Sequence, residues 1–60
     1  MIPQDPVMLL SFVNMKLRDE YRGLEALAEG LDISSDELKT IVEKLEAIGY
    51  IYNAEHNKFM

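Results

Sequence analysis

The sequence predicts a mainly α fold, in which three helices in helix-turn-helix order are followed by a short C-terminal two-stranded hairpin. The stretch Ser34 to Ile48 is amphipathic and has its own start signal. A second short helical pattern ends just before it, in Leu31-Asp32-Ile33, and a β-favouring segment, Tyr50-Ile51-Tyr52, comes just after it. Helix, tight turn, helix and small ribbon is the order of a helix-turn-helix with a vestigial wing.

The size and composition of the chain limit what it can be. Its 60 residues predict one domain, 1–60, with a small core and marginal stability. The chain has no Cys and one His, which excludes disulfides and a zinc site. The apolar run from Val7 to Val13 is far shorter than the roughly 20 residues that span a bilayer, and no basic segment precedes it. We therefore expect an unprocessed cytoplasmic protein that starts at Met1 and makes no membrane contact.

The first helix is predicted from Pro6 to Arg18 or Asp19, after an extended lead-in from Met1 to Gln4. Asp5 is a good N-cap, and proline at the first helical position loses no hydrogen bond. On a helical wheel one broad apolar arc collects Leu9, Leu10, Phe12, Val13 and Leu17, with Met8 and Met15 on its flank.

This arc is wider than one buried face requires, and two interpretations stay open. In the first, the helix is the centre of a tiny core and is covered on two sides. In the second, Met8, Phe12 and Met15 form a partly exposed patch that binds a partner or a second copy of the chain.

The end of this helix carries half of the basic residues: Lys16, Arg18 and Arg22. Asp19 and Glu20 lie among them and dilute the positive charge. Cations near a helix C-terminus are favoured by the helix dipole, so the simpler interpretation is a solvated helix end. The alternative is contact with an anion or phosphate.

The second helix is predicted from Leu24 to Gly30, with a buried side formed by Leu24, Leu27, Ala28 and Leu31. The third is predicted over residues 34–48. Ser34 and Glu37 have the spacing of a capping box, and Gly49 is placed to end the helix. Its expected buried stripe is Leu38, Ile41, Val42, Leu45 and Ile48.

The hairpin is predicted over residues 50–60. Tyr50-Ile51-Tyr52 is the expected first strand, Asn53 to Asn57 the turn, and Lys58 to Met60 the return strand. Because an isolated two-stranded hairpin is marginal, we expect Tyr50, Tyr52 or Phe59 to hold it against the helices.

No constellation in the sequence predicts catalysis. The chain has no Cys nucleophile, no second His and no Gly-rich phosphate loop, and Ser34 and Ser35 are better explained as caps. His56 falls in the predicted turn, where a solvated side chain is the simpler interpretation. We expect no enzyme activity, no cofactor or metal, and no small-molecule substrate.

The whole chain resembles the family of short bacterial proteins known as domain of unknown function 4250. The resemblance rests on the opening M-I-P-x-D-P-V-M-L-L-S-F-V-N, on K-L-R-D, on the L-x-x-L spacing of the second helix, and on I-G-Y-x-Y followed by N-x-F. It implies a single-domain bacterial protein and brings no function. Leu24 to Tyr52 more loosely resembles winged-helix regulators, from which it departs in its short wing and in the acidic outer face of the third helix.

Two functions remain open. The one we favour is a small non-catalytic protein–protein interaction module on a helix-turn-helix, winged-helix-like scaffold, able to associate with itself. The alternative is a nucleic-acid-binding regulator. Its expected contacts are Lys16, Arg18, Arg22, Lys39 and Lys44. A net charge of −5 argues against that alternative, because affinity for nucleic acid comes largely from Lys and Arg.

Overall fold

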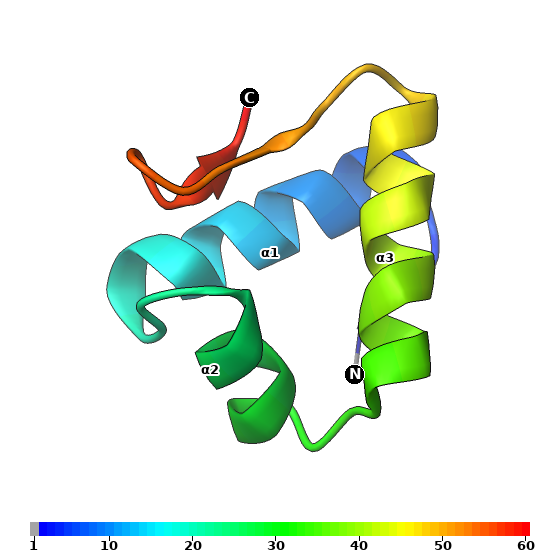
Figure 1. Ribbon diagram of the computed structural model, residues 1–60. Coiled ribbons are helices and arrows are strands. Elements are labelled where there is room, and N and C mark those ends of the chain that lie inside the picture. Colours follow the sequence, from blue (N-terminus) through cyan, green and yellow to red (C-terminus); the bar gives the residue numbers. More distant parts are fainter. Residues whose placement is uncertain (1) are drawn as a thin grey trace.

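The computed structural model describes residues 2–60 and contains three helices followed by an antiparallel hairpin (Figure 1). The elements are α1 (Pro6–Asp19), α2 (Leu24–Gly30), α3 (Ser35–Ala47), β1 (Tyr52–Asn53) and β2 (Lys58–Phe59). The predicted mainly α fold, with three helices and a C-terminal two-stranded hairpin, is confirmed. Residue 1, where the extended lead-in is expected to begin, lies outside the described residues.

The helix boundaries follow the capping signals in the sequence. The Asp5 carboxylate accepts a hydrogen bond from the Met8 backbone N–H at 3.1 Å, and Pro6 opens α1. Both bonds of the capping box between Ser34 and Glu37 are present at the start of α3. Gly49 has a φ of +91°, a left-handed conformation that favours glycine, and it follows the last turn of α3. These local contacts place each helix end within one residue of its predicted position.

One hydrophobic core joins the three helices and the hairpin, and α1 lies at its centre. In Figure 1, α1 runs between the hairpin and α2, with α3 across one end, and it contacts all three. The buried side chains come from every part of the chain: Leu9, Val13, Leu17, Leu27, Ile41, Leu45 and Phe59. Burying such a side chain stabilises the fold by about 1.5–3 kcal/mol, so these residues carry most of its stability.

Two details of the C-terminal third differ from the prediction. The first strand begins at Tyr52 rather than at Tyr50, although Ile51 and Met60 still exchange backbone hydrogen bonds of 3.2 and 3.0 Å. Ile48 was expected in the buried stripe of α3 but is 38% exposed. Ile48 follows the last residue of α3 as its C-cap, one position beyond the helix.

Two asparagines fasten the hairpin to α1, and the sequence patterns did not reveal either. The Asn14 side-chain amide donates to the Phe59 carbonyl at 3.0 Å and accepts from the Phe59 N–H at 2.8 Å. The Asn57 amide donates to the carbonyls of Leu17 and Tyr21 at 3.0 and 2.9 Å. Asn57 also accepts a 2.7 Å bond from the Tyr52 hydroxyl. The hairpin is therefore held by side-chain amides as well as by the buried Phe59 ring.

A close contact fixes α2 against the end of α1. A Cβ atom at Gly30 would lie 2.3–2.5 Å from ring atoms of Tyr21, so only glycine fits there without movement of the ring. Gly30 also ends α2, as the sequence predicts. After it the chain turns at Asp32, whose φ is 56°. Within residues 2–60, no helix has the length and apolar character needed to cross a membrane.

Candidate protein interface

The outer side of α1 exposes large apolar side chains to solvent. Val7 is 66% exposed, Met8 is 62% exposed and Met15 is 42% exposed. Met8 and Met15 are seven residues apart, two helical turns, and therefore lie on the same side of the helix. We call Val7, Met8 and Met15 the apolar face of α1.

Phe12, the third residue of the predicted patch, lies differently from the two methionines. It is half-buried and packs against the core. The Lys16 ammonium lies 5.8 Å from the centre of its ring, within the range of a cation–π contact. The structure thus divides the wide apolar arc. Its centre fills the core, Phe12 marks its edge, and Met8 and Met15 remain outside.

The hairpin carries further apolar surface. Ile51 and Met60 are opposite each other in the extended ladder and are 63% and 52% exposed. Tyr52 and Phe59 form the adjacent pair and point inward, with ring centroids 5.5 Å apart. Because side chains alternate along a strand, Ile51 and Met60 point to the opposite, outer side of the hairpin.

Strand β2 of the hairpin runs antiparallel to α1. Asn57 bonds to carbonyls at the C-terminal end of α1, and Phe59 bonds to Asn14 in its middle. The next residue, Met60, therefore lies toward the N-terminal half of α1, the half that carries Val7 and Met8.

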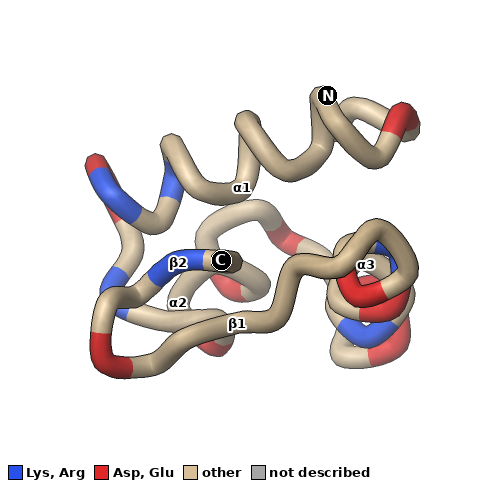
Figure 2. The backbone as a smooth tube through the Cα atoms, turned by 90° about the horizontal axis from the view of Figure 1, so that it is seen from above, with Lys and Arg blue, Asp and Glu red and all other residues tan. Residues whose placement is uncertain are grey.

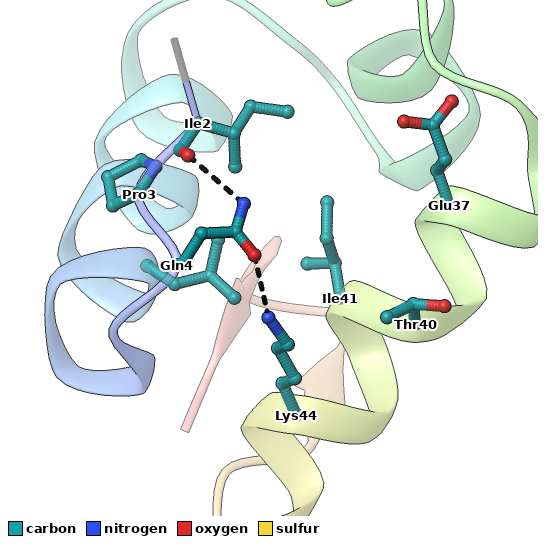
Figure 3. A pocket seen from close by; sticks show the side chains of 8 residues that line it. Ile2, Pro3, Gln4, Glu37, Thr40, Ile41 and Lys44 are labelled. Atoms are coloured by element: carbon teal, nitrogen blue, oxygen red, sulfur yellow. Dashed lines mark hydrogen bonds between the residues drawn. The ribbon is translucent and has the colours of Figure 1, made fainter.

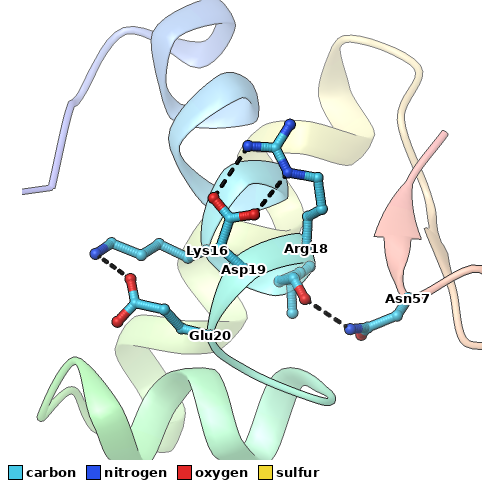
Figure 4. A network of polar contacts seen from close by, with 6 residues as sticks. Lys16, Arg18, Asp19, Glu20 and Asn57 are labelled. Atoms are coloured by element: carbon cyan, nitrogen blue, oxygen red, sulfur yellow. Dashed lines mark hydrogen bonds and ion pairs between the residues drawn. The ribbon is translucent and has the colours of Figure 1, made fainter.

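The predicted cations at the end of α1 are largely neutralised by their neighbours (Figure 4). Lys16 forms an ion pair of 2.6 Å with Glu20, which raises the pKa of the Lys16 ammonium above its usual value. Arg18 donates two hydrogen bonds to the Asp19 carboxylate, at 2.8 and 3.0 Å. The guanidinium lowers the pKa of the Asp19 carboxyl. These pairs satisfy part of the local charge without a partner molecule.

The five cations considered for nucleic-acid contact do not form one cluster. Lys16, Arg18 and Arg22 gather where α1 ends, whereas Lys39 and Lys44 lie on α3 among its carboxylates (Figure 2). Lys58, which was not among the five, lies on β2, the strand that contacts α1. Charge is therefore mixed along α3 and more positive at the junction of α1 and the hairpin.

A broad hollow of about 670 Å³ lies between α1 and the hairpin at this junction. Its lining combines polar, basic and apolar side chains: Ser11, Asn14, Met15, Leu17, Arg18, His56, Asn57 and Lys58. We call it the α1–hairpin groove. Met15 belongs both to this groove and to the apolar face of α1, so the two surfaces are continuous.

A smaller pocket of about 170 Å³ lies between the N-terminal segment and α3 (Figure 3). Lys44 donates a 2.9 Å hydrogen bond to the Gln4 side-chain oxygen, and the Gln4 side-chain nitrogen donates to the Ile2 carbonyl at 3.4 Å. The volume is below the roughly 300 Å³ typical of ligand sites. Among residues 2–60, no three His, Asp or Glu side chains are grouped so as to hold a metal ion.

Met8 and Met15 are exposed, as a contact patch on α1 requires, whereas no sequence pattern indicated that Val7 and Lys58 border these surfaces. In the sequence, Val7 is one of several apolar residues in a helical segment, and only the tertiary structure shows that its side chain is exposed. Lys58 lines the same hollow as Arg18 because of the path of the hairpin, for which no local pattern exists.

Comparison with known proteins finds one similarity. A family model with the description "Domain of unknown function (DUF4250)" matches residues 3–59 of the chain. No match is found among curated proteins or among solved structures.

Proposed function

We propose that this chain, which belongs to the DUF4250 family, is a small non-catalytic protein–protein interaction module that contacts its partner through the apolar face of α1. In the simplest case the partner is a second copy of the chain. The observation that carries the proposal is the exposure of Val7, Met8 and Met15 on one helix. Methionine adapts to irregular partner surfaces, which suits such a contact.

The size of this surface limits the affinity it can give. Fully burying one such side chain contributes about 1.5–3 kcal/mol, so covering the exposed parts of three contributes roughly 2.5–5 kcal/mol, and roughly twice that when two copies cover each other's faces. Association costs about 4–15 kcal/mol in lost translational and rotational freedom. Self-association through this face alone is therefore weak, and a tight complex needs further surface beside it.

The order of the elements is compatible with a helix-turn-helix scaffold. The segment Leu31 to Ile33 connects α2 to α3, and the hairpin follows α3 as a short wing would. In the proposed module α3 serves as scaffold rather than as a reading helix, because Ile41 and Leu45 are in the core. Its outer side carries Asp36, Glu37, Glu43 and Glu46 beside two lysines.

The test compares matched apolar-to-polar variants. In Met8→Gln/Met15→Gln, concentration-dependent association measured by sedimentation equilibrium is expected to disappear. Ile48→Gln changes an exposed apolar residue at the far end of α3 and is expected to leave it intact. A photo-crosslinking amino acid at position 8, with one at position 48 as control, identifies partners other than the chain itself. A chain that stays monomeric at millimolar concentration and forms no position-8-specific adduct would refute the proposal.

The alternative, nucleic-acid binding, is favoured by one observation: the end of α1, whose backbone carries Lys16 and Arg18, lies at the same end of the molecule as the strand that carries Lys58 (Figure 2). The pairing of two of these cations with Glu20 and Asp19 weakens it. A salt titration of binding to mixed-sequence DNA separates the two functions, because non-specific affinity for DNA rises steeply as salt is lowered.

A further inference from the structure

We propose that the α1–hairpin groove receives an acidic segment of the partner protein, with carboxylates at Arg18 and Lys58 and an apolar side chain against Met15. This inference rests on the proposed interaction function and names the chemistry of the partner. It also supplies the further surface that the apolar face of α1 needs.

The charge of the groove is opposite to that of the molecule as a whole. The chain has 11 acidic and 6 basic residues, yet no Asp or Glu lines the groove, whereas Arg18, Lys58 and His56 do. Within residues 2–60, Lys58 forms no ion pair. A carboxylate entering the groove therefore meets cations in a place where the carboxylates of this chain are absent.

Arg18 remains able to bind a second carboxylate while it holds Asp19. The bonds to Asp19 use Nε and Nη2, which leaves the donors of Nη1 free. The Arg18 side chain is 73% exposed and lies outside the core, so it can turn toward the groove without disturbing the packing. An exposed ion pair such as Arg18–Asp19 contributes little stability, so sharing its guanidinium costs little.

The floor of the groove favours a protein segment over a nucleic acid. Met15 gives it an apolar side, and no aromatic residue is among the side chains that line it. Proteins that bind single-stranded nucleic acids stack bases on aromatic rings.

The segment must bind through its side chains rather than by adding a strand to β2. The outward-facing N–H and carbonyl of Phe59 are already occupied by Asn14, and the Asn57 side-chain amide donates to the carbonyls of Leu17 and Tyr21. The exposed charged donors that line the groove are those of Arg18 and Lys58. Selectivity for carboxylates is therefore the expected property of this groove.

The probes are short fluorescent peptides of alternating sequence: Glu with Leu, Gln with Leu, Lys with Leu, and Glu with Ser. A mixed-sequence DNA duplex is the fifth probe. Binding to the full chain is followed by fluorescence anisotropy at low and high salt. Arg18→Glu/Lys58→Glu tests the groove, and Lys39→Glu/Lys44→Glu reverses two cations on α3 as the matched control. Circular dichroism of each variant verifies that it is folded.

The Glu–Leu peptide is expected to bind best and to weaken as salt rises. Arg18→Glu/Lys58→Glu is expected to weaken it about tenfold, the effect of roughly 1.4 kcal/mol, and the control variant is expected to change it little. No binding of the Glu–Leu peptide, equal binding of the Lys–Leu peptide, or equal loss in both variants overturns the inference. Binding of DNA in preference to every peptide overturns it in favour of the nucleic-acid alternative. Failure here combined with Met8- and Met15-dependent association leaves the proposed function standing without the groove.

Discussion

The attachment of the hairpin to α1 gives the sharpest prediction, because a single side chain makes it testable. Asn14→Ala removes both hydrogen bonds between the Asn14 amide and the Phe59 backbone. Phe59 is only 2% exposed, so its N–H and carbonyl have little access to replacement water. The hairpin should then loosen from the helix while the three helices remain formed.

The expected loss follows from these contacts. A buried polar group left without its partner costs about 1–3 kcal/mol, and Asn14→Ala leaves two such groups. Alanine regains about 0.6 kcal/mol through its higher helix propensity. The free energy of unfolding should therefore fall by about 1.5–5 kcal/mol. That is a large part of the roughly 3–9 kcal/mol expected for a domain of this size.

Urea unfolding followed by circular dichroism measures this loss, with Ser11→Ala as the control at an exposed position of the same helix. Hydrogen exchange locates the loss, because protection of the Ile51 and Met60 amides should fall more than protection of the amides in α3. Equal unfolding free energies for Asn14→Ala and Ser11→Ala, with unchanged protection in the hairpin, would refute the assigned role of Asn14.

Two further predictions concern α2 and the end of α1. Gly30→Ala should lower the free energy of unfolding by about 1 kcal/mol despite the better helix propensity of alanine, because the new Cβ overlaps the Tyr21 ring. Gly23→Ala is the control, since its Cβ would meet only the Tyr52 hydroxyl at 3.8 Å, and denaturant unfolding should find it nearly neutral. A Gly30→Ala variant that is more stable than the unmodified chain would contradict this packing. The Asp19 carboxyl should titrate below its ordinary value of 3.8 by NMR, and Arg18→Gln should return it toward that value. Because the pKa of Asp19 is lower in the folded state than in the unfolded state, the contribution of this pair to stability is present above pH 3.8 and is lost as the pH falls through the folded pKa. An identical Asp19 titration in both proteins would show that the pair does not persist in solution.

The helices were predictable because their signals are local. The Asp5 side chain and the capping box of Ser34 and Glu37 form hydrogen bonds with backbone N–H groups at the starts of α1 and α3, within three residues along the chain. Gly49 follows the end of α3 with a positive φ. Hydrophobic spacing likewise identified most of the core, since a residue three or four positions from a buried one shares its side of the helix. The prediction was wrong where the apolar spacing of a helix continues to a residue that the core does not bury, as at Ile48.

The candidate surfaces were only partly predictable. The sequence showed that α1 has more apolar residues than one side needs, and it left two interpretations of that excess. Packing decided between them residue by residue, burying Leu9 and Val13, half-burying Phe12 and leaving Met8 and Met15 outside. The groove could not be foreseen at all, because it depends on how β2 returns along α1.

By itself, the sequence determined the number, order and limits of the helices and the presence of a C-terminal hairpin. The tertiary structure alone decided where the hairpin docks, which apolar residues of α1 remain exposed, and that Arg18 and Lys58 line one groove. The physical reason is the separation along the chain over which each interaction acts. Caps and helical periodicity act over a few residues, whereas the bonds from Asn14 and Asn57 join positions 36 to 45 residues apart.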